Sequence, residues 1–303
     1  PGRQFPYFFK GLNRNKKSLT VDLQSAQGQE ICHRLAKSVD IFAEGFRPGS
    51  AKRLGIGYEA IRKTNPDVIY VSISGYGQDG PYRNWPAHDL SYQGIAGMLS
   101  GIISKGGEPA LPPVPIADLS SGMFATIAIL AALHHRNLTG EGQYIDVSMT
   151  DGLVSWMSAP LTLYAHTGQS FFAREPGFGI FETSDKKFIT LSIAHEDTFW
   201  ANLCHILGKD EMGKLSRSER VARYEELRTM LCQIISTRTR DEWVRILPEA
   251  NVAAGPAYNI AEVYDDPQLK HRKMLFDLEA PGEKLKQVGH PIKFSVTPAE
   301  VRL

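Results

Sequence analysis

Short β-branched stretches alternate with helical stretches through the first 75 residues, and this alternation constrains the fold more than any other feature of the sequence. Strands are predicted over residues 18–23, 39–43 and 68–74, with a helix carrying Ile31 and Leu35 and another over 59–65 between them. Strands separated by helices pair in parallel and carry the helices on their faces. The sequence therefore predicts an α/β domain built on a parallel sheet.

Ligands of such sheets bind beyond the carboxyl ends of the strands. Those ends fall at residues 22–23, 44–47 and 74–77, and Arg47 and Arg53 lie close to the second of them. Arginines near strand ends and helix starts suit phosphate groups, but from the pattern alone a solvated basic face is the preferred interpretation. The chain has no GxGxxG and no GxxxxGK[ST] motif, so a nicotinamide or P-loop nucleotide site is not supported.

Residues 86–123 hold a histidine and a carboxylate that we expect to converge. His88 opens an apolar helical stretch, and Asp118 stands where a loop that contains Gly106-Gly107 and several prolines gives way to the next helix. Asp118 is also a good candidate for the N-cap of that helix, which needs no catalytic role. The two interpretations are compatible, because a carboxylate held by helix amides stays ionised and fixed in direction, as a base or nucleophile requires.

The remaining chain predicts a second, smaller α/β region. Helices are expected over 119–136 and 151–168 around a strand at 143–148, and then antiparallel strands within 177–193, a helix over 196–207, helices within 218–248, a strand near 252–257 and a return strand at 289–295. We place a large domain at 1–165, a small domain at 166–265 and a segment returning to the large domain at 266–303.

Composition excludes several classes of protein. The 34 lysines and arginines balance 33 acidic residues, so no nucleic-acid partner is indicated. The three cysteines lack metal-ligand spacing and suit a reducing compartment, so we expect free thiols, no metal site and a cytoplasmic location. Met123 to Leu133 is the longest apolar run, too short for a membrane span. No membrane partner is therefore expected.

Seven segments, taken in order, resemble the family III CoA-transferases, which include the α-methylacyl-CoA racemases. They are AEGFRPG (43–49), KRLGIG (52–57), NPDVIYVSISGYGQDGP (65–81), AHDLSYQGIAG (87–97), PIADLSSGM (115–123), TGEGQYIDVSMTDG (139–152) and GHPIKFS (289–295). The resemblance implies a Rossmann-like large domain, a small α/β domain and an interlocked homodimer. It also implies acyl-CoA thioester substrates, with coenzyme A as part of the substrate and no permanently bound cofactor. The family's opening strand and helix have no counterpart in the sequence.

The resemblance also assigns roles to individual residues. Asp118 corresponds to the family's catalytic aspartate, a nucleophile in transferases and a base in racemases. His88 followed by Asp89 resembles the racemases, as does Glu196, which would support the second base. For coenzyme A, Arg53 is similar to a phosphate ligand and Arg47 is a further candidate. Val21, Leu23 and Gln24 resemble the adenine-side wall, with Gln24 where a lysine is usual.

Racemisation at C2 of a 2-methylacyl-CoA by His88 and Asp118 is the reaction that these residues favour. It needs two bases, since inversion requires protonation from the face opposite to removal. Amides at the start of the Leu119 helix are expected to hold the enolate oxygen. The alternative is transfer of CoA from a thioester to a carboxylic acid through an aspartyl-CoA intermediate at Asp118. A CoA-binding protein without turnover is a third possibility.

Overall fold

The computed structural model describes residues 5–102, 108–169, 174–280 and 283–301. Contacts divide the chain into two compact units. The parallel-sheet unit comprises residues 19–172, and the antiparallel-sheet unit comprises residues 1–18 with 173–303. The division made from the sequence differs, because it placed residues 1–18 and 266–303 with the large domain.

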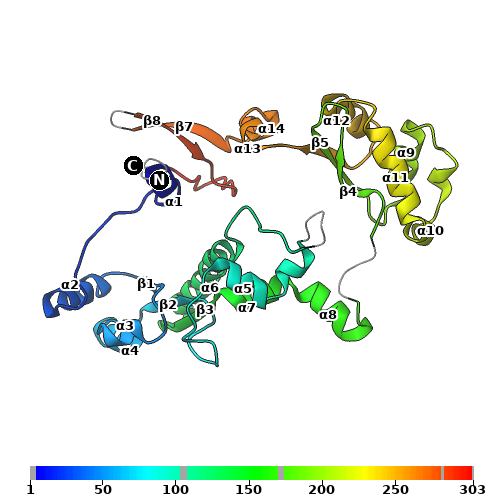
Figure 1. The fold of residues 1–303 in the computed structure, drawn as a ribbon. Helices are drawn as coiled ribbons and strands as arrows, with labels where there is room; N and C mark the ends of the chain where they lie inside the picture. Colours follow the sequence, from blue (N-terminus) through cyan, green and yellow to red (C-terminus); the bar gives the residue numbers. More distant parts are fainter. Residues whose placement is uncertain (1–4, 103–107, 170–173, 281–282, 302–303) are drawn as a thin grey trace. The chain divides into compact units, whose positions relative to one another are not determined.

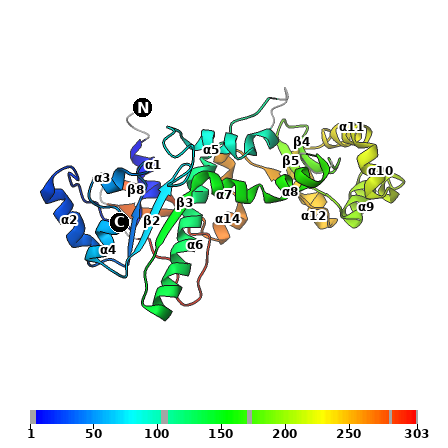
Figure 2. The same cartoon turned by 90° about the horizontal axis from the view of Figure 1, so that it is seen from below.

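The parallel-sheet unit is built around strands β1 (Ile41–Glu44), β2 (Ile69–Ser74) and β3 (Tyr144–Ser148), as Figures 1 and 2 show. The strands pair in parallel in the order β1-β2-β3. The helices are α2 (Ala26–Ala36), α3 (Ser50–Arg53), α4 (Tyr58–Thr64), α5 (Asp89–Ile95), α6 (Ile116–Thr139), α7 (Met149–Trp156) and α8 (Ser158–Thr167), with a 3-10 turn at Met98–Gly101. The predicted α/β architecture with a parallel sheet is therefore confirmed.

Alternate residues of β2, together with Val68 just before it, serve two different cores. Val68 and Tyr70 pack with α2, α3 and α4, whereas Ile69 and Val71 pack against α6. All four are essentially fully buried, which stabilises the unit by roughly 1.5–3 kcal/mol for each aliphatic side chain. Because helices cover both faces of β2, its continuous apolar sequence is that of a central parallel strand.

The antiparallel-sheet unit contains β4 (Phe178–Glu182), β5 (Phe188–Ser192) and β6 (Ala254–Ala257), in that order, and a separate hairpin of β7 (Leu275–Ala280) and β8 (Glu283–Val288). Its helices are α1 (Phe5–Leu12), α9 (Asp197–Ile206), α10 (Arg217–Ala222), α11 (Tyr224–Ile235), α12 (Arg240–Glu249), α13 (Ile260–Val263) and α14 (Pro267–His271), with a 3-10 turn at Met212–Lys214. One apolar core, centred on Trp200 and Trp243, joins the three-stranded sheet to α9, α11 and α12.

Several predicted elements differ from the structure. Residues 18–23 form no strand, because this extended stretch has no strand partner among the described residues. The helix expected over 151–168 is broken at Met157 into α7 and α8. The return strand predicted at 289–295 is wrong; the strands of this region are β7 and β8, which were not predicted.

Candidate active site

Asp118 lies in the first turn of α6, where it is not the capping residue that the sequence suggested. Pro115 occupies the N-cap position, and Asp118 is the third helical residue. The cap comes instead from Asp89, whose Oδ1 accepts hydrogen bonds from the amides of Ala117 at 2.6 Å and Asp118 at 3.3 Å. A carboxylate at this place satisfies amides that the helix leaves unpaired and interacts favourably with the helix dipole.

The same contacts correct the expected oxyanion site. The amides of Ala117 and Asp118 are already bound to Asp89, and the amide of Leu119 donates to the carbonyl of Pro115 at 3.0 Å. Since these donors are occupied, the start of α6 does not present them to a substrate oxygen. The Gly106-Gly107 loop that precedes the helix lies outside the described residues.

Asp89 is itself held by the helix that it begins. Its Oδ2 accepts a hydrogen bond from Gln93 Nε2, one turn further along α5, at 2.5 Å. Gln93 is fully buried. The two oxygens of Asp89 thus link α5 to the first turn of α6.

The surroundings of Asp118 make its carboxyl group more basic than usual. Its pKa is raised, first because neighbouring atoms partly desolvate the group and second because the negative charge of Asp89 is close. His88 opposes the shift, so its imidazole also lies within electrostatic reach. The structure therefore places Asp89 and His88 within electrostatic reach of Asp118, and the catalytic roles of the three residues stay predictions.

His88 occupies the N-cap position of α5 with an exposed side chain that makes no capping hydrogen bond there. This position beside Asp118 suits either a proton donor or a base.

Tyr92 is a neighbour of the site that sequence reasoning missed. Its ring packs directly over Gly75, at the end of β2, where a Cβ atom would lie 2.4 Å from the phenol oxygen. The hydroxyl donates to the carbonyl of Ala87 at 3.0 Å. Burial raises the pKa of Tyr92 most, the charge of Asp118 adds to the rise, and that of Arg47 opposes it. Tyr92 therefore packs on the end of β2 and lies within electrostatic reach of Asp118 and Arg47.

The residues predicted to bind coenzyme A lie at two turns of the parallel-sheet unit. Arg53 ends α3, is exposed, and donates from Nη2 to Ser50 Oγ at 2.8 Å. The exposed Arg47 precedes the same helix. Their exposed guanidinium groups remain available to an anion.

The second turn contains Val21, Leu23 and Gln24. Leu23 packs against the core that includes residues of α2, α3 and α4, whereas Gln24 is exposed and donates its backbone N–H to Asp22 Oδ1 at 2.9 Å. The turn leads into α2, whose N-cap is Ser25. The half-buried Leu23 beside the exposed Gln24 is compatible with the predicted wall of an adenine site.

A cavity of about 600 Å³ opens on the α4 side of the sheet. Its lining includes three tyrosines, Tyr58, Tyr70 and Tyr144, which contact one another, and the basic residues Lys52, Lys63 and Arg83. Gly49 and Lys52 in this lining neighbour Arg53 in the sequence. The cavity is therefore near the predicted phosphate-binding turn.

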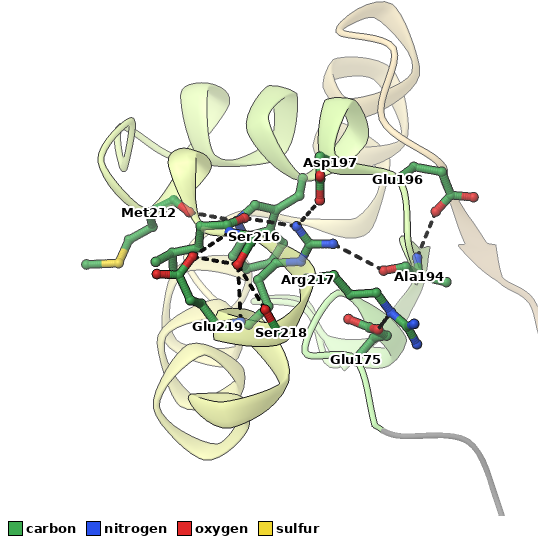
Figure 3. A network of polar contacts seen from close by, with 12 residues as sticks. Glu175, Ala194, Glu196, Asp197, Met212, Ser216, Arg217, Ser218 and Glu219 are labelled. Atoms are coloured by element: carbon green, nitrogen blue, oxygen red, sulfur yellow. Dashed lines mark hydrogen bonds and ion pairs between the residues drawn. The ribbon is translucent and has the colours of Figure 1, made fainter.

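Glu196 belongs to the antiparallel-sheet unit, at the N-cap position of α9. Its Oε2 accepts from the amide of Ala194 at 3.0 Å, and hydrogen bonds to its own backbone and to Ala194 lower its pKa. Figure 3 shows the polar network around this turn, which also contains Asp197. The predicted support of a second base by Glu196 stays a prediction.

Arg220 anchors the turn that carries Glu196. The guanidinium group is 1% exposed and pairs with Asp197 Oδ1 at 2.6 Å. It also donates to the carbonyls of Leu215 and Ala194 and lies over the ring of Trp200. These contacts fix the backbone on both sides of Glu196.

The sequence model described as CoA-transferase family III matches residues 2–303. The chain belongs to CoA-transferase family III. It is 31% identical to an acyl-CoA transferase of Fusarium pseudograminearum, over 95% of this chain and 65% of that protein. It is 32% identical to the acetyl-CoA:oxalate CoA-transferase of Acetobacter aceti, over 95% of this chain and 75% of that protein.

A solved structure has the same fold as this family III chain. The orthorhombic crystal structure of Rv3272 from Mycobacterium tuberculosis superposes with a TM-score of 0.86 and is 29% identical, covering 95% of this chain and 80% of that one. The family predicted from the sequence segments is thus confirmed. The chain spans 65% and 75% of the length of the two relatives named above.

Within the described residues, no group of three or more His, Cys, Asp and Glu side chains is arranged to hold a metal ion. By length and composition alone, α6 is apolar enough to cross a bilayer, which the sequence analysis did not expect. Core helices of soluble proteins meet the same criterion, and α6 packs against β2, β3 and α7.

Proposed function

We propose that this protein transfers coenzyme A from an acyl-CoA thioester to a carboxylic acid, with Asp118 as the nucleophile. The observation that carries the proposal is the carboxyl group of Asp118, raised in pKa and held next to Asp89 and His88 at the first turn of α6. A more basic carboxylate is a better nucleophile once it is deprotonated. The transferase names of the relatives support the same choice.

The reaction is written in four balanced steps. The Asp118 carboxylate attacks the thioester carbonyl, which forms an acyl-aspartyl anhydride and releases the CoA thiolate. The thiolate attacks the aspartyl carbonyl, which forms aspartyl-CoA and frees the donor acid. The acceptor carboxylate then attacks aspartyl-CoA and releases the thiolate, which finally takes the acceptor's acyl group from the new anhydride. Asp118 is regenerated, and no oxidant or metal is consumed.

The chain's own residues supply binding and orientation for these steps. Arg53 and Arg47 would hold phosphates of coenzyme A, and the turn of Val21, Leu23 and Gln24 would lie along the adenine. His88 would donate a hydrogen bond to an oxygen on which charge develops. Asp89 would keep Asp118 fixed in direction and basic.

Racemisation of a 2-methylacyl-CoA is the second candidate, and a specific observation favours it. His88 lies beside Asp118, as a pair of bases would require. In this reaction, Glu196 would support one of the two bases. The two reactions differ at the α-carbon, because only racemisation exchanges its proton.

One experiment separates the two reactions. The protein is incubated with (2R)- and (2S)-2-methylacyl-CoA in deuterated water, with and without added carboxylic acids such as oxalate or succinate. We expect the CoA thioester of the added acid to form, while C2 of the 2-methylacyl group takes up no deuterium. Deuterium entering with inversion, and no new thioester, would establish racemisation instead.

We also propose that the protein acts as a homodimer in the cytoplasm. Large apolar side chains on α6 are exposed in the single chain, namely Leu119, Met123, Ile127 and Leu130, each at 50% or more. A continuous apolar helix face of this kind marks an interaction surface. Sedimentation equilibrium at micromolar concentration tests the proposal, and a monomer would contradict it.

A further inference from the structure

Gln93 is an unusual residue for the interior of the parallel-sheet unit. Its side chain is 0% exposed, and its Nε2 donates to Asp89 Oδ2 at 2.5 Å. Its Oε1 accepts no hydrogen bond from the residues that the structure describes. A buried amide with one unpaired oxygen costs stability, so an apolar residue of the same size would serve the core better.

The contacts of Gln93 continue as far as Asp118. Gln93 fixes one oxygen of Asp89, and the other oxygen of Asp89 accepts from the amides of Ala117 and Asp118. With both oxygens bound, the carboxylate of Asp89 cannot rotate without losing a hydrogen bond. The first turn of α6 is thereby held in one position relative to α5.

We propose that Gln93 is a positioning residue for the nucleophile Asp118 and acts through Asp89. The inference rests on the proposed function, in which the carboxyl group of Asp118 is the nucleophile. A loss of orientation at a reacting group lowers the rate of the chemical step while substrate binding at remote groups persists. Gln93 therefore affects turnover and not the affinity for acyl-CoA.

A purely structural role for Gln93 gives a different expectation. If the residue served only to fill the core of α5, its replacement would lower stability, and any loss of activity would follow that stability. The substitution Gln93→Met tests the difference, because methionine has a similar volume and cannot donate a hydrogen bond. Ile61→Val, a buried change on the other side of the sheet, is the matched control for lost stability.

The first readout is amide hydrogen exchange, which does not depend on activity. In Gln93→Met, we expect the amides of Ala117 and Asp118 to exchange about tenfold faster than in the wild type, since their acceptor is no longer held. Other α6 amides, and all α6 amides of Ile61→Val, should keep their rates. Unchanged exchange at residues 117 and 118 would overturn the proposal.

The second readout is a double-mutant cycle with Asp89→Ala. Gln93→Met alone should lower kcat about tenfold and leave KM for acyl-CoA unchanged. In the Asp89→Ala background it should have no further effect, because the residue through which it acts is absent. Independent losses that multiply would show that Gln93 does not act through Asp89. If the wild type transfers no CoA, the proposed function fails, while the exchange rates still decide whether Gln93 holds the turn.

Discussion

The carboxylate of Asp89 caps the helix that carries Asp118, accepting the backbone amide of Asp118 over 3.3 Å. The two residues are 29 positions apart in the sequence, and they come from different helices. Asp89 thus has two effects on its neighbour: its hydrogen bonds fix the helical turn, and its charge raises the pKa of the Asp118 carboxyl group.

The charge of Asp89 should be visible in the pH dependence of activity. Asp118 must be ionised to attack, so activity falls as pH drops through its raised pKa. Asp89→Asn removes the negative charge but keeps an oxygen that accepts the helix amides. The pKa of Asp118 then decreases, and the acidic limb of kcat should move to lower pH. Profiles of kcat against pH for the wild type and Asp89→Asn check this. An acidic limb at the same or at a higher pH in the variant would contradict it.

Arg53 should contribute binding energy and little else. Arg53→Ala removes a charged hydrogen-bond donor to phosphate, so we expect KM for acyl-CoA to rise about tenfold with kcat nearly unchanged. Arg34→Ala, at an exposed arginine of α2, is the control for loss of a positive charge. An equal rise of KM in both variants would mean that the loss of any positive surface charge weakens binding, and not the loss of a specific contact of Arg53.

Gly75 should tolerate no side chain. The Cβ of Gly75→Ala would meet the buried ring of Tyr92 at 2.4 Å, which forces the ring or α5 to move. We expect a loss of about 1–3 kcal/mol in the free energy of unfolding. Gly94→Ala is the matched control within α5, since its Cβ would meet only Leu99 at 3.9 Å. Urea unfolding compares them, and equal stability of both variants would refute the close packing.

Asp197 should stabilise the antiparallel-sheet unit through Arg220. Asp197→Ala leaves the buried guanidinium without its carboxylate, and we expect a cost of about 2–3 kcal/mol. Glu211→Ala breaks an exposed pair with Lys214 and should cost less than about 1 kcal/mol. Denaturant titrations of the two variants measure the difference. Similar losses would mean that the Arg220 pair contributes no more than an exposed one.

Periodicity was sufficient to predict the parts of the fold whose burial is regular. The β-branched run that ends at Ser74 forms β2, whose two faces are covered by helices. The apolar stretch after Asp118 forms α6, which packs on one of these faces. Residues 18–23 have the composition of a strand but no neighbour to pair with in the described chain. Pairing is a tertiary property, and composition does not determine it.

The candidate site was predicted only in part, because some of its contacts depend on tertiary packing. His88 and Asp118 were singled out from the pattern of residues 86–123, and Asp89 from the segments that carry the family resemblance. Gln93 and the capping role of Asp89 were missed, since both depend on how α5 packs against α6. The spacing of Asp89 and Gln93, one helical turn apart, was the available signal. Likewise, Pro281-Gly282 is a turn signal that would have suggested strands on either side.

Covalent chemistry at Asp118 is the central claim, and mass spectrometry tests it most directly. The protein is incubated with acyl-CoA and hydroxylamine and then digested, with Asp118→Asn as the control; Asp89 still caps α6 there, so the fold should persist. We predict a hydroxamate on the peptide that contains Asp118, absent from the variant, whose transfer rate should fall on the order of 10⁴-fold. Transfer of CoA that proceeds without modification of Asp118, or that persists in Asp118→Asn, would contradict the account.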